Sequence, residues 1–126
     1  MMTGLNHVGL FVKDVQVSKA FYTETLGFEV TCEATMDDGT KVCFVRFNDL
    51  TIEIVQFPEY SQKCDGYFDH IAFMVDDIEA TMQDLAAKGI AFETAEPVFM
   101  PVFEKGVRYI MFRGPDGEHL ELNQIL

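Results

Sequence analysis

The sequence predicts an α+β fold made of two tandem β-α-β-β-β modules with curved mixed sheets. Three observations in the 126 residues lead to this prediction. The stretch NHVGLFVKDVQ at 6–16 is similar to DHIAFMVDDIE at 69–79, each stretch reads as a strand followed by a helix, and three strand-like runs come after each. The matched order of elements indicates an internal duplication, with chance similarity between amphipathic strands as the alternative.

The first module, about residues 1–57, opens with a strand that ends at an acidic residue able to cap the following helix. The helix is predicted over about 15–26 and ends at Gly27, because glycine favours the end of a helix. Three strands follow, separated by the turn signals DDGT and ND: FEVTCEATM, KVCFVRF and LTIEIVQF.

The second module, about residues 69–126, repeats this order. Its helix is expected to begin at a capping box formed by Asp76 and Glu79, and to end at Gly89. The helical spacing is carried by Ile78, Met82 and Leu85. Three strands are predicted after it: IAFET, VRYIMFR and EHLELNQI, the last two joined by GPDG. Residues 58–68 are expected to link the two modules within a single domain, 1–126.

One connection in the second module is unusually apolar. Residues 95–106, AEPVFMPVFEKG, contain Pro97 and Pro101, so this stretch cannot be an ordinary inner strand. It also carries five large apolar residues: Val98, Phe99, Met100, Val102 and Phe103. The stretch is therefore expected either to pack on the core or to cover a pocket.

Composition and charge exclude several classes of partner. Nine basic and 21 acidic residues give a net charge of −12, which disfavours nucleic acids and anionic membranes, because both are bound through clustered Lys and Arg. No apolar run approaches the roughly 20 residues of a membrane span, and no signal peptide is visible. A cytoplasmic protein with three free thiols is therefore expected. A reactive Cys64 in a polar loop is the alternative.

Four of the predicted strands each place one side chain that can bind a metal on the face opposite their aliphatic residues. These side chains are His7, Glu53, His70 and Glu121. The duplication relates the two histidines to each other and the two glutamates to each other. Gly9 and Ala72, two residues beyond each histidine, would leave room beside an ion.

The same faces are rich in apolar neighbours, so an unpaired carboxylate there would cost several kcal/mol. Two imidazoles and two carboxylates around one divalent ion would offset this cost. Such a donor set suits Zn or Ni, with Mn, Co or Fe(II) as alternatives. A single histidine or glutamate on a strand is more often structural, but four at duplicated positions favour a metal site.

The whole chain resembles the vicinal oxygen chelate superfamily. The resemblance rests on the ligand pattern and on four blocks: HVGLFVKDV, FYTETLGF, DHIAFMVDDI and GPDGEHLEL. It implies two curved sheets whose concave faces enclose a metal pocket.

Within that superfamily, the order His-Glu-His-Glu is similar to glyoxalase I (lactoylglutathione lyase), which isomerises the hemithioacetal of methylglyoxal and glutathione. Glyoxalase I builds its sites across a dimer, so the resemblance implies a homodimer, although relatives also form sites within one chain. Related epimerases tend to have Gln at the position of Glu53. Dioxygenases and fosfomycin-modifying enzymes lack that ligand, and bleomycin-binding members lack all four.

The substrate is expected to differ from that of glyoxalase I. Bacterial glyoxalase I typically has Arg four residues after the first His and Asn four residues after the first Glu, where this chain has Phe11 and Phe57. Losing a cation and an amide argues against ordinary glutathione recognition. Both aromatics are read either as core or as substrate contacts. The predicted substrate-binding residues are Phe11, Phe57, Met74, Phe99, Met100 and Asn123.

The resemblance implies isomerisation or epimerisation of a small molecule by proton transfer beside a carbonyl. Glu121, or its counterpart Glu53, would move the proton. His7 and His70 would act as ligands only. His119, next to the GPDG turn, is expected to be solvated and without a role. A module that binds metal or a small ligand without turnover is the rival reading, and an oxygenase is a third.

Overall fold

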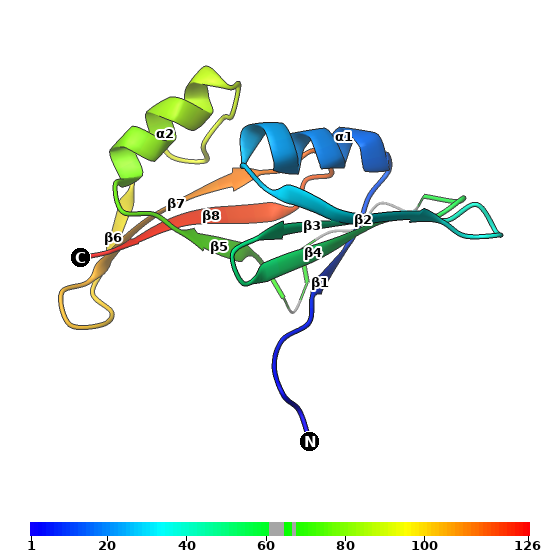
Figure 1. Ribbon diagram of the computed structural model, residues 1–126. Helices are drawn as coiled ribbons and strands as arrows, with labels where there is room; N and C mark the ends of the chain where they lie inside the picture. The colour runs from blue at the N-terminus through cyan, green and yellow to red at the C-terminus, as the bar shows by residue number, and fades with distance from the viewer. Residues whose placement is uncertain (61–64, 67) are drawn as a thin grey trace. The chain divides into compact units, whose positions relative to one another are not determined.

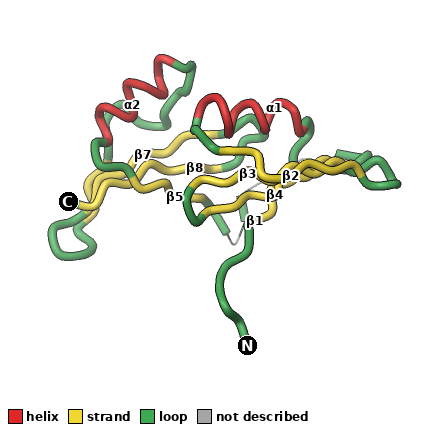
Figure 2. The backbone as a smooth tube through the Cα atoms, viewed as in Figure 1, coloured by secondary structure: helices red, strands yellow, loops and turns green. Residues whose placement is uncertain are grey.

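In the computed structural model, the described residues are 1–60, 65–66 and 68–126. The chain divides into two compact units, Met1–Lys63 (unit 1) and Cys64–Leu126 (unit 2). Each unit has the predicted β-α-β-β-β order, with a four-stranded sheet and a helix on one of its faces (Figure 1 and Figure 2). Parts of the predicted linker, and Cys64 with them, lie outside the described residues.

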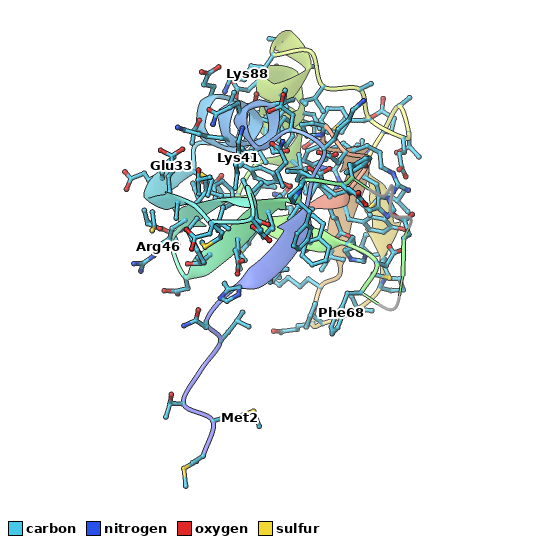
Figure 3. All side chains as sticks on the ribbon, turned by 90° about the vertical axis from the view of Figure 1, so that its right-hand side faces the viewer. Met2, Glu33, Lys41, Arg46, Phe68 and Lys88 are labelled. Carbon is cyan, nitrogen blue, oxygen red and sulfur yellow. The ribbon has the colours of Figure 1, made fainter. Side chains whose placement is uncertain are left out.

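Unit 1 forms a mixed sheet in the order β1-β4-β3-β2. Strands β1 and β4 are parallel, whereas β4 with β3 and β3 with β2 are antiparallel. The first residues extend away from this sheet, as Met2 shows (Figure 3). The elements are β1 (Val8–Phe11), α1 (Val15–Ala20), η1 (Phe21–Thr25), β2 (Glu29–Thr35), β3 (Lys41–Phe47) and β4 (Leu50–Gln56).

The sequence explains where the helix of unit 1 begins and ends. Asp14 is the N-cap, and its carboxylate accepts hydrogen bonds from the backbone N–H groups of Gln16 and Val17. The helix closes in a π-helical turn, η1, and Gly27 follows with a φ of 81°, a conformation that favours glycine. The predicted end at Gly27 is therefore confirmed. The helix contributes Val15 and Tyr22 to the buried core of unit 1, and the sheet contributes Cys43, Val45, Ile52 and Ile54.

Unit 2 repeats this topology in the order β5-β8-β7-β6, with β5 parallel to β8 and the other pairs antiparallel. Its elements are β5 (Ile71–Met74), α2 (Ile78–Ala87), β6 (Val98–Met100), β7 (Val107–Arg113) and β8 (His119–Ile125). Its buried apolar residues are Ile78, Leu85, Val107, Ile110, Phe112, Leu120 and Leu122.

One predicted strand is wrong. The run IAFET does not form a strand; Phe92 makes only an isolated bridge to Phe112, and the chain bends just after it. The first strand after α2 is instead β6, which lies inside the proline-containing stretch 95–106. It fits between Pro97 and Pro101 because it is a three-residue edge strand, where a missing N–H is tolerated.

The predicted capping box of α2 is also wrong by one residue. The N-cap is Asp77, whose carboxylate accepts from the backbone N–H of Ala80 at 2.9 Å. Asp76 instead offers its backbone carbonyl to the side chain of Gln124. Positions 76 and 77 both carry aspartate, so residue type does not identify the N-cap of α2. The backbone geometry of the folded chain does.

Asp77→Ala is expected to lower the free energy of unfolding by about 1 kcal/mol, because the helix loses its side-chain cap. Asp76→Ala is the matched control and should change stability by less than about 0.5 kcal/mol. Urea unfolding followed by circular dichroism measures both. Equal losses in the two variants would contradict the assignment of Asp77 as the cap.

Two further expectations concern membranes and thiols. Among the described helices, none has the length and apolar character needed to cross a membrane. Cys32 and Cys43 are free thiols. Cys43 is buried, and this burial raises the pKa of its thiol, whereas Cys32 is exposed.

Candidate functional site

In unit 1, the pairing of β1 with β4 brings one histidine and one glutamate together. Gly9 pairs with Glu53 across the two strands, and His7 lies two residues before Gly9 on the same face. His7 Nε2 is 2.8 Å from Glu53 Oε2. A Cβ atom built on Gly9 would meet no other atom within 4 Å, so there is open space beside the pair.

Unit 2 repeats this arrangement on β5 and β8. Ala72 pairs with Glu121, as Gly9 does with Glu53, and His70 lies two residues before Ala72. His70 Nε2 is 3.3 Å from Glu121 Oε2. Each unit therefore supplies one imidazole and one carboxylate in the same register.

The other ring nitrogen of each histidine faces the side chain of the preceding residue. His7 Nδ1 is 2.6 Å from Asn6 Oδ1, and His70 Nδ1 is 3.0 Å from Asp69 Oδ2. Sequence reasoning did not identify these two partners, although the dipeptides NH and DH mark them at equivalent positions. Hydrogen bonds from His70 first, and from His119 second, lower the pKa of Asp69 below its ordinary value.

The two glutamates differ in environment. The side chain of Glu121 is 9% exposed, whereas that of Glu53 is 25% exposed. Asn123 Nδ2 donates to Glu121 Oε1 at 2.7 Å, so this carboxylate is held with its second oxygen toward His70. Asn123, predicted as a substrate contact, thus makes a hydrogen bond that orients Glu121.

His119 is not solvated, so that expectation is wrong. Its side chain is 13% exposed, and its Nδ1 is 3.1 Å from Asp69 Oδ2. Its Nε2 is 3.1 Å from Glu93 Oε1 but lacks hydrogen-bond geometry, so the imidazole lies close to this carboxylate without a hydrogen bond to it. Arg113 pairs with Glu93 at 3.1 Å and with Asp65 at 2.7 Å. No local pattern in the sequence reveals this cluster.

The two phenylalanines of unit 1 that were predicted to contact substrate lie against each other. Phe11 and Phe57 have ring centroids 5.2 Å apart in an edge-on arrangement, and both are exposed rather than part of the buried core. Phe44, which pairs with Glu53 from β3, places its ring 5.6 Å from that of His7. The ligand-bearing face of unit 1 is therefore lined by aromatic side chains.

The predicted substrate contacts of unit 2 do not all share one face. Met74 pairs with Asn123 on the face of Glu121, and it is exposed. Met100 pairs with Val107, whose other partner is Ile125, so the register puts Met100 on the same face.

Phe99 is placed differently. It pairs with Arg108, and the guanidinium of Arg108 contacts Glu79 on helix α2. The pair therefore lies on the helix-bearing face of the sheet, opposite Glu121. The structure separates Phe99 from the other predicted substrate contacts.

The donor groups fit a divalent ion. Asn6 and Asp69 engage the Nδ1 atoms, which leaves both Nε2 atoms directed at a carboxylate oxygen. Imidazole nitrogen and carboxylate oxygen are ligands of Zn, Ni, Mn and Fe(II). The open space at Gly9 leaves room for the ion in unit 1.

The chain is similar to proteins of known families. The model of the Glyoxalase/Bleomycin resistance protein/Dioxygenase superfamily matches residues 4–122. The chain is 31% identical to "Uncharacterized protein YwbC" of Bacillus subtilis (strain 168), with 98% of this chain and 99% of that protein covered. It is 30% identical to the mitochondrial methylmalonyl-CoA epimerase of Homo sapiens, with 95% and 73% covered.

A solved structure with the same fold contains a metal. It is a mutant of the fosfomycin resistance protein FosX from Listeria monocytogenes, complexed with Mn(II) and 1S,2S-dihydroxypropylphosphonic acid. Its TM-score is 0.75 and its identity to this chain is 25%, with 97% of this chain and 92% of that chain covered.

Proposed function

Because the chain belongs to the Glyoxalase/Bleomycin resistance protein/Dioxygenase superfamily, also called the vicinal oxygen chelate superfamily, we propose that it is a metal-dependent enzyme that moves a proton beside a carbonyl group. The single observation that carries the proposal is the repeated pair of histidine and glutamate, one pair in each unit and in the same strand register. A relative named as an epimerase supports proton transfer, and a solved structure of the same fold with bound Mn(II) supports a metal ion.

We propose that the two pairs together hold one divalent ion, Zn or Ni first and Mn, Co or Fe(II) next. The ligands would be His7, Glu53, His70 and Glu121. When bound, such an ion supplies Lewis-acid polarisation of a substrate carbonyl. Two units from one chain, or from two chains of a homodimer, would complete the ligand set.

Glu121 is our candidate for the proton-moving group. Its carboxylate would take the proton from the carbon beside the carbonyl, so that the C–H electrons pass toward the carbonyl oxygen. Returning the proton to the neighbouring carbon gives isomerisation, provided that the hydroxyl proton of the first carbon passes to the former carbonyl oxygen, so that the first carbon becomes the new carbonyl. Returning a proton to the opposite face of the same carbon gives epimerisation. Glu53 is the alternative to Glu121 as the proton-moving group. His7 and His70 would bind the ion and take no proton.

The side chains on the ligand-bearing faces favour a small or apolar substrate. Phe11 and Phe57 offer exposed aromatic surface where a glutathione-binding relative has a cation and an amide. Arg108, which could otherwise bind a glutathione carboxylate, is paired with Glu79. We therefore propose a short α-hydroxycarbonyl or related compound as the substrate, rather than a glutathione adduct.

Turnover of the glutathione hemithioacetal of methylglyoxal should be weak, with kcat/KM below about 10⁴ M⁻¹s⁻¹, the low end of the usual range for enzymes. The reason is that neither Phe11 nor Phe57 can pair with a carboxylate or donate to an amide. Steady-state assays with Zn-loaded and Ni-loaded protein measure this. A value at or above that limit would mean that other residues hold the glutathione.

The direct test of the proposed function is proton exchange. Protein loaded in turn with Zn, Ni and Mn is incubated in D₂O with small α-hydroxycarbonyl compounds, and loss of the C–H signal is followed by NMR. Exchange that disappears on chelation of the metal supports the enzyme. A protein that binds metal but exchanges no proton is a binding module, and oxygen consumption with Fe(II) would indicate an oxygenase instead.

We also propose that the protein is cytoplasmic and forms a homodimer. The free thiols of Cys32 and Cys43 suit a reducing compartment. Analytical ultracentrifugation with and without Zn measures the assembly state.

A further inference from the structure

The two half-sites differ at the ring nitrogen that points away from the glutamate. In unit 1, His7 Nδ1 faces the neutral amide oxygen of Asn6. In unit 2, His70 Nδ1 faces the carboxylate of Asp69. A carboxylate that accepts the Nδ1–H fixes the tautomer of a metal-binding histidine and makes its other nitrogen a stronger ligand. An amide oxygen does this more weakly, because it carries no charge.

Asp69 is held by a second histidine in addition to His70. It accepts from His70 and from His119 through the same oxygen, Oδ2, at 3.0 and 3.1 Å. Behind His119 lies Glu93, which is paired with Arg113. This series of contacts fixes the position of the Asp69 carboxylate although the carboxylate itself is exposed.

Unit 1 has a different residue at the place of His119. His119 directly precedes Leu120, the partner of Ile71, and in unit 1 the residue that precedes the matching partner is Thr51. Threonine has no imidazole, so Thr51 cannot support Asn6 in the way that His119 supports Asp69. The extended support is therefore specific to the second half of the duplication.

We propose that the two histidines are unequal ligands, with His70 the stronger one because Asp69, braced by His119, positions it, and with His7 the weaker one. This inference rests on the proposed function, in which both histidines bind the same ion. Asp69 and His119 are positioning residues here, since they act through His70. The first half of the site would then be the one that opens when a substrate or a competing ligand binds.

A second metal site is the competing explanation of the same cluster. Single ligand atoms of Asp65, Asp69 and His119 lie within 4.8 Å of one another. However, Asp65 already pairs with Arg113, whose charge repels a cation, and Asp69 is engaged by both imidazoles. The contacts therefore fit a support for His70 better than a site of their own.

The test uses the full chain and measures Zn affinity by competition with a chromophoric chelator. Asp69→Asn, which gives unit 2 the group found in unit 1, should weaken Zn binding about 10–100-fold, the usual effect of losing such a partner. Asp69→Glu, which keeps the carboxylate, should recover part of the loss. Asn6→Asp, the reciprocal change on the exposed N-terminal segment, should strengthen binding.

Two controls separate the explanations. Asp65→Asn removes a carboxylate from the same cluster but leaves the contact between Asp69 and His70 in place. It should change Zn affinity less than about twofold, since Asp65 is not the hydrogen-bond partner of His70. His119→Gln should weaken binding less than Asp69→Asn does. In the Zn-loaded protein, the Nδ1–H proton of His70 should give a ¹H–¹⁵N signal that moves in Asp69→Asn and stays in Asp65→Asn, which loss of general stability would not produce.

The outcomes are distinct. If His7→Ala and His70→Ala leave Zn binding unchanged, the proposed metal site is wrong and this inference fails with it. If those two variants lose Zn while Asp69→Asn and Asn6→Asp bind like the parent, the inequality alone is overturned. If Asp65→Asn loses as much as Asp69→Asn, or if the parent holds a second Zn per chain that Asp65→Asn removes, the cluster is itself the metal site.

Discussion

Glu121→Gln is expected to lower kcat about 10²–10⁴-fold in the metal-loaded protein, the usual contribution of a general base. Glutamine keeps the size of the side chain and one oxygen that can bind a cation, but it cannot take a proton from carbon. The single amide oxygen can either accept from Asn123, as Glu121 Oε1 does, or face the proposed ion, as Oε2 would, so part of the binding should be lost. Metal content should therefore fall only in part. Kinetics on a substrate found by the exchange assay, with elemental analysis of the same samples, measures both effects.

Glu53→Gln is the matched control, because it makes the same chemical change at the duplicated position. Its effect on kcat should be smaller. The side chain of Glu53 is more exposed than that of Glu121. The family resemblance also implies that a Gln is tolerated at this position. Near-parental kcat in Glu121→Gln, together with loss of turnover in Glu53→Gln, would reverse the assignment of the base.

The sequence predicts the inner strands well because both of their edges are paired and every second side chain enters the core. Strands β3 and β7 occupy 41–47 and 107–113, the ranges that alternation predicts. The duplicated order of elements then follows from the sequence alone, and so does the opposition of Ile52 and Ile54 to Glu53.

The same reasoning fails where pairing is one-sided. The run IAFET is strand-like in composition, yet the chain bends there, and the edge strand β6 forms between two prolines instead. An edge strand needs only one partner, so its composition carries little information. The face of Phe99 is unpredictable for the same reason, since it depends on which residue of β7 pairs with it.

The partners of the candidate ligands also differ in how well the sequence predicts them. Asn6 and Asp69 directly precede the two histidines, so both partners can be found in the sequence as the dipeptides NH and DH. His119 is 50 residues away from Asp69, and only the pairing of β5 with β8 brings the two together. A contact of that kind depends on register, which a single sequence specifies only after the fold is known.

Removing a histidine should weaken metal binding more than any other single change. A structural Zn site with four protein ligands binds with about 10–16 kcal/mol, or about 2.5–4 kcal/mol per ligand, so one lost ligand should lower the affinity about 10²–10³-fold. We expect a loss of this size in His70→Ala and a smaller one in His7→Ala, because Asn6 supports His7 less than Asp69 supports His70.

Competition titrations with Zn and with Ni, repeated from neutral to acidic pH, measure these losses. Binding should weaken as the pH falls in the parent, because an imidazole must be deprotonated to bind a metal and acid supplies the competing proton. His119→Ala removes the one remaining histidine, which supports Asp69 but is not a proposed ligand, so it should lower the affinity less than His7→Ala or His70→Ala does. If His7→Ala and His70→Ala bind both metals as tightly as the parent, the ion lies elsewhere, and the His–Glu pairs on β1–β4 and β5–β8 are structural contacts.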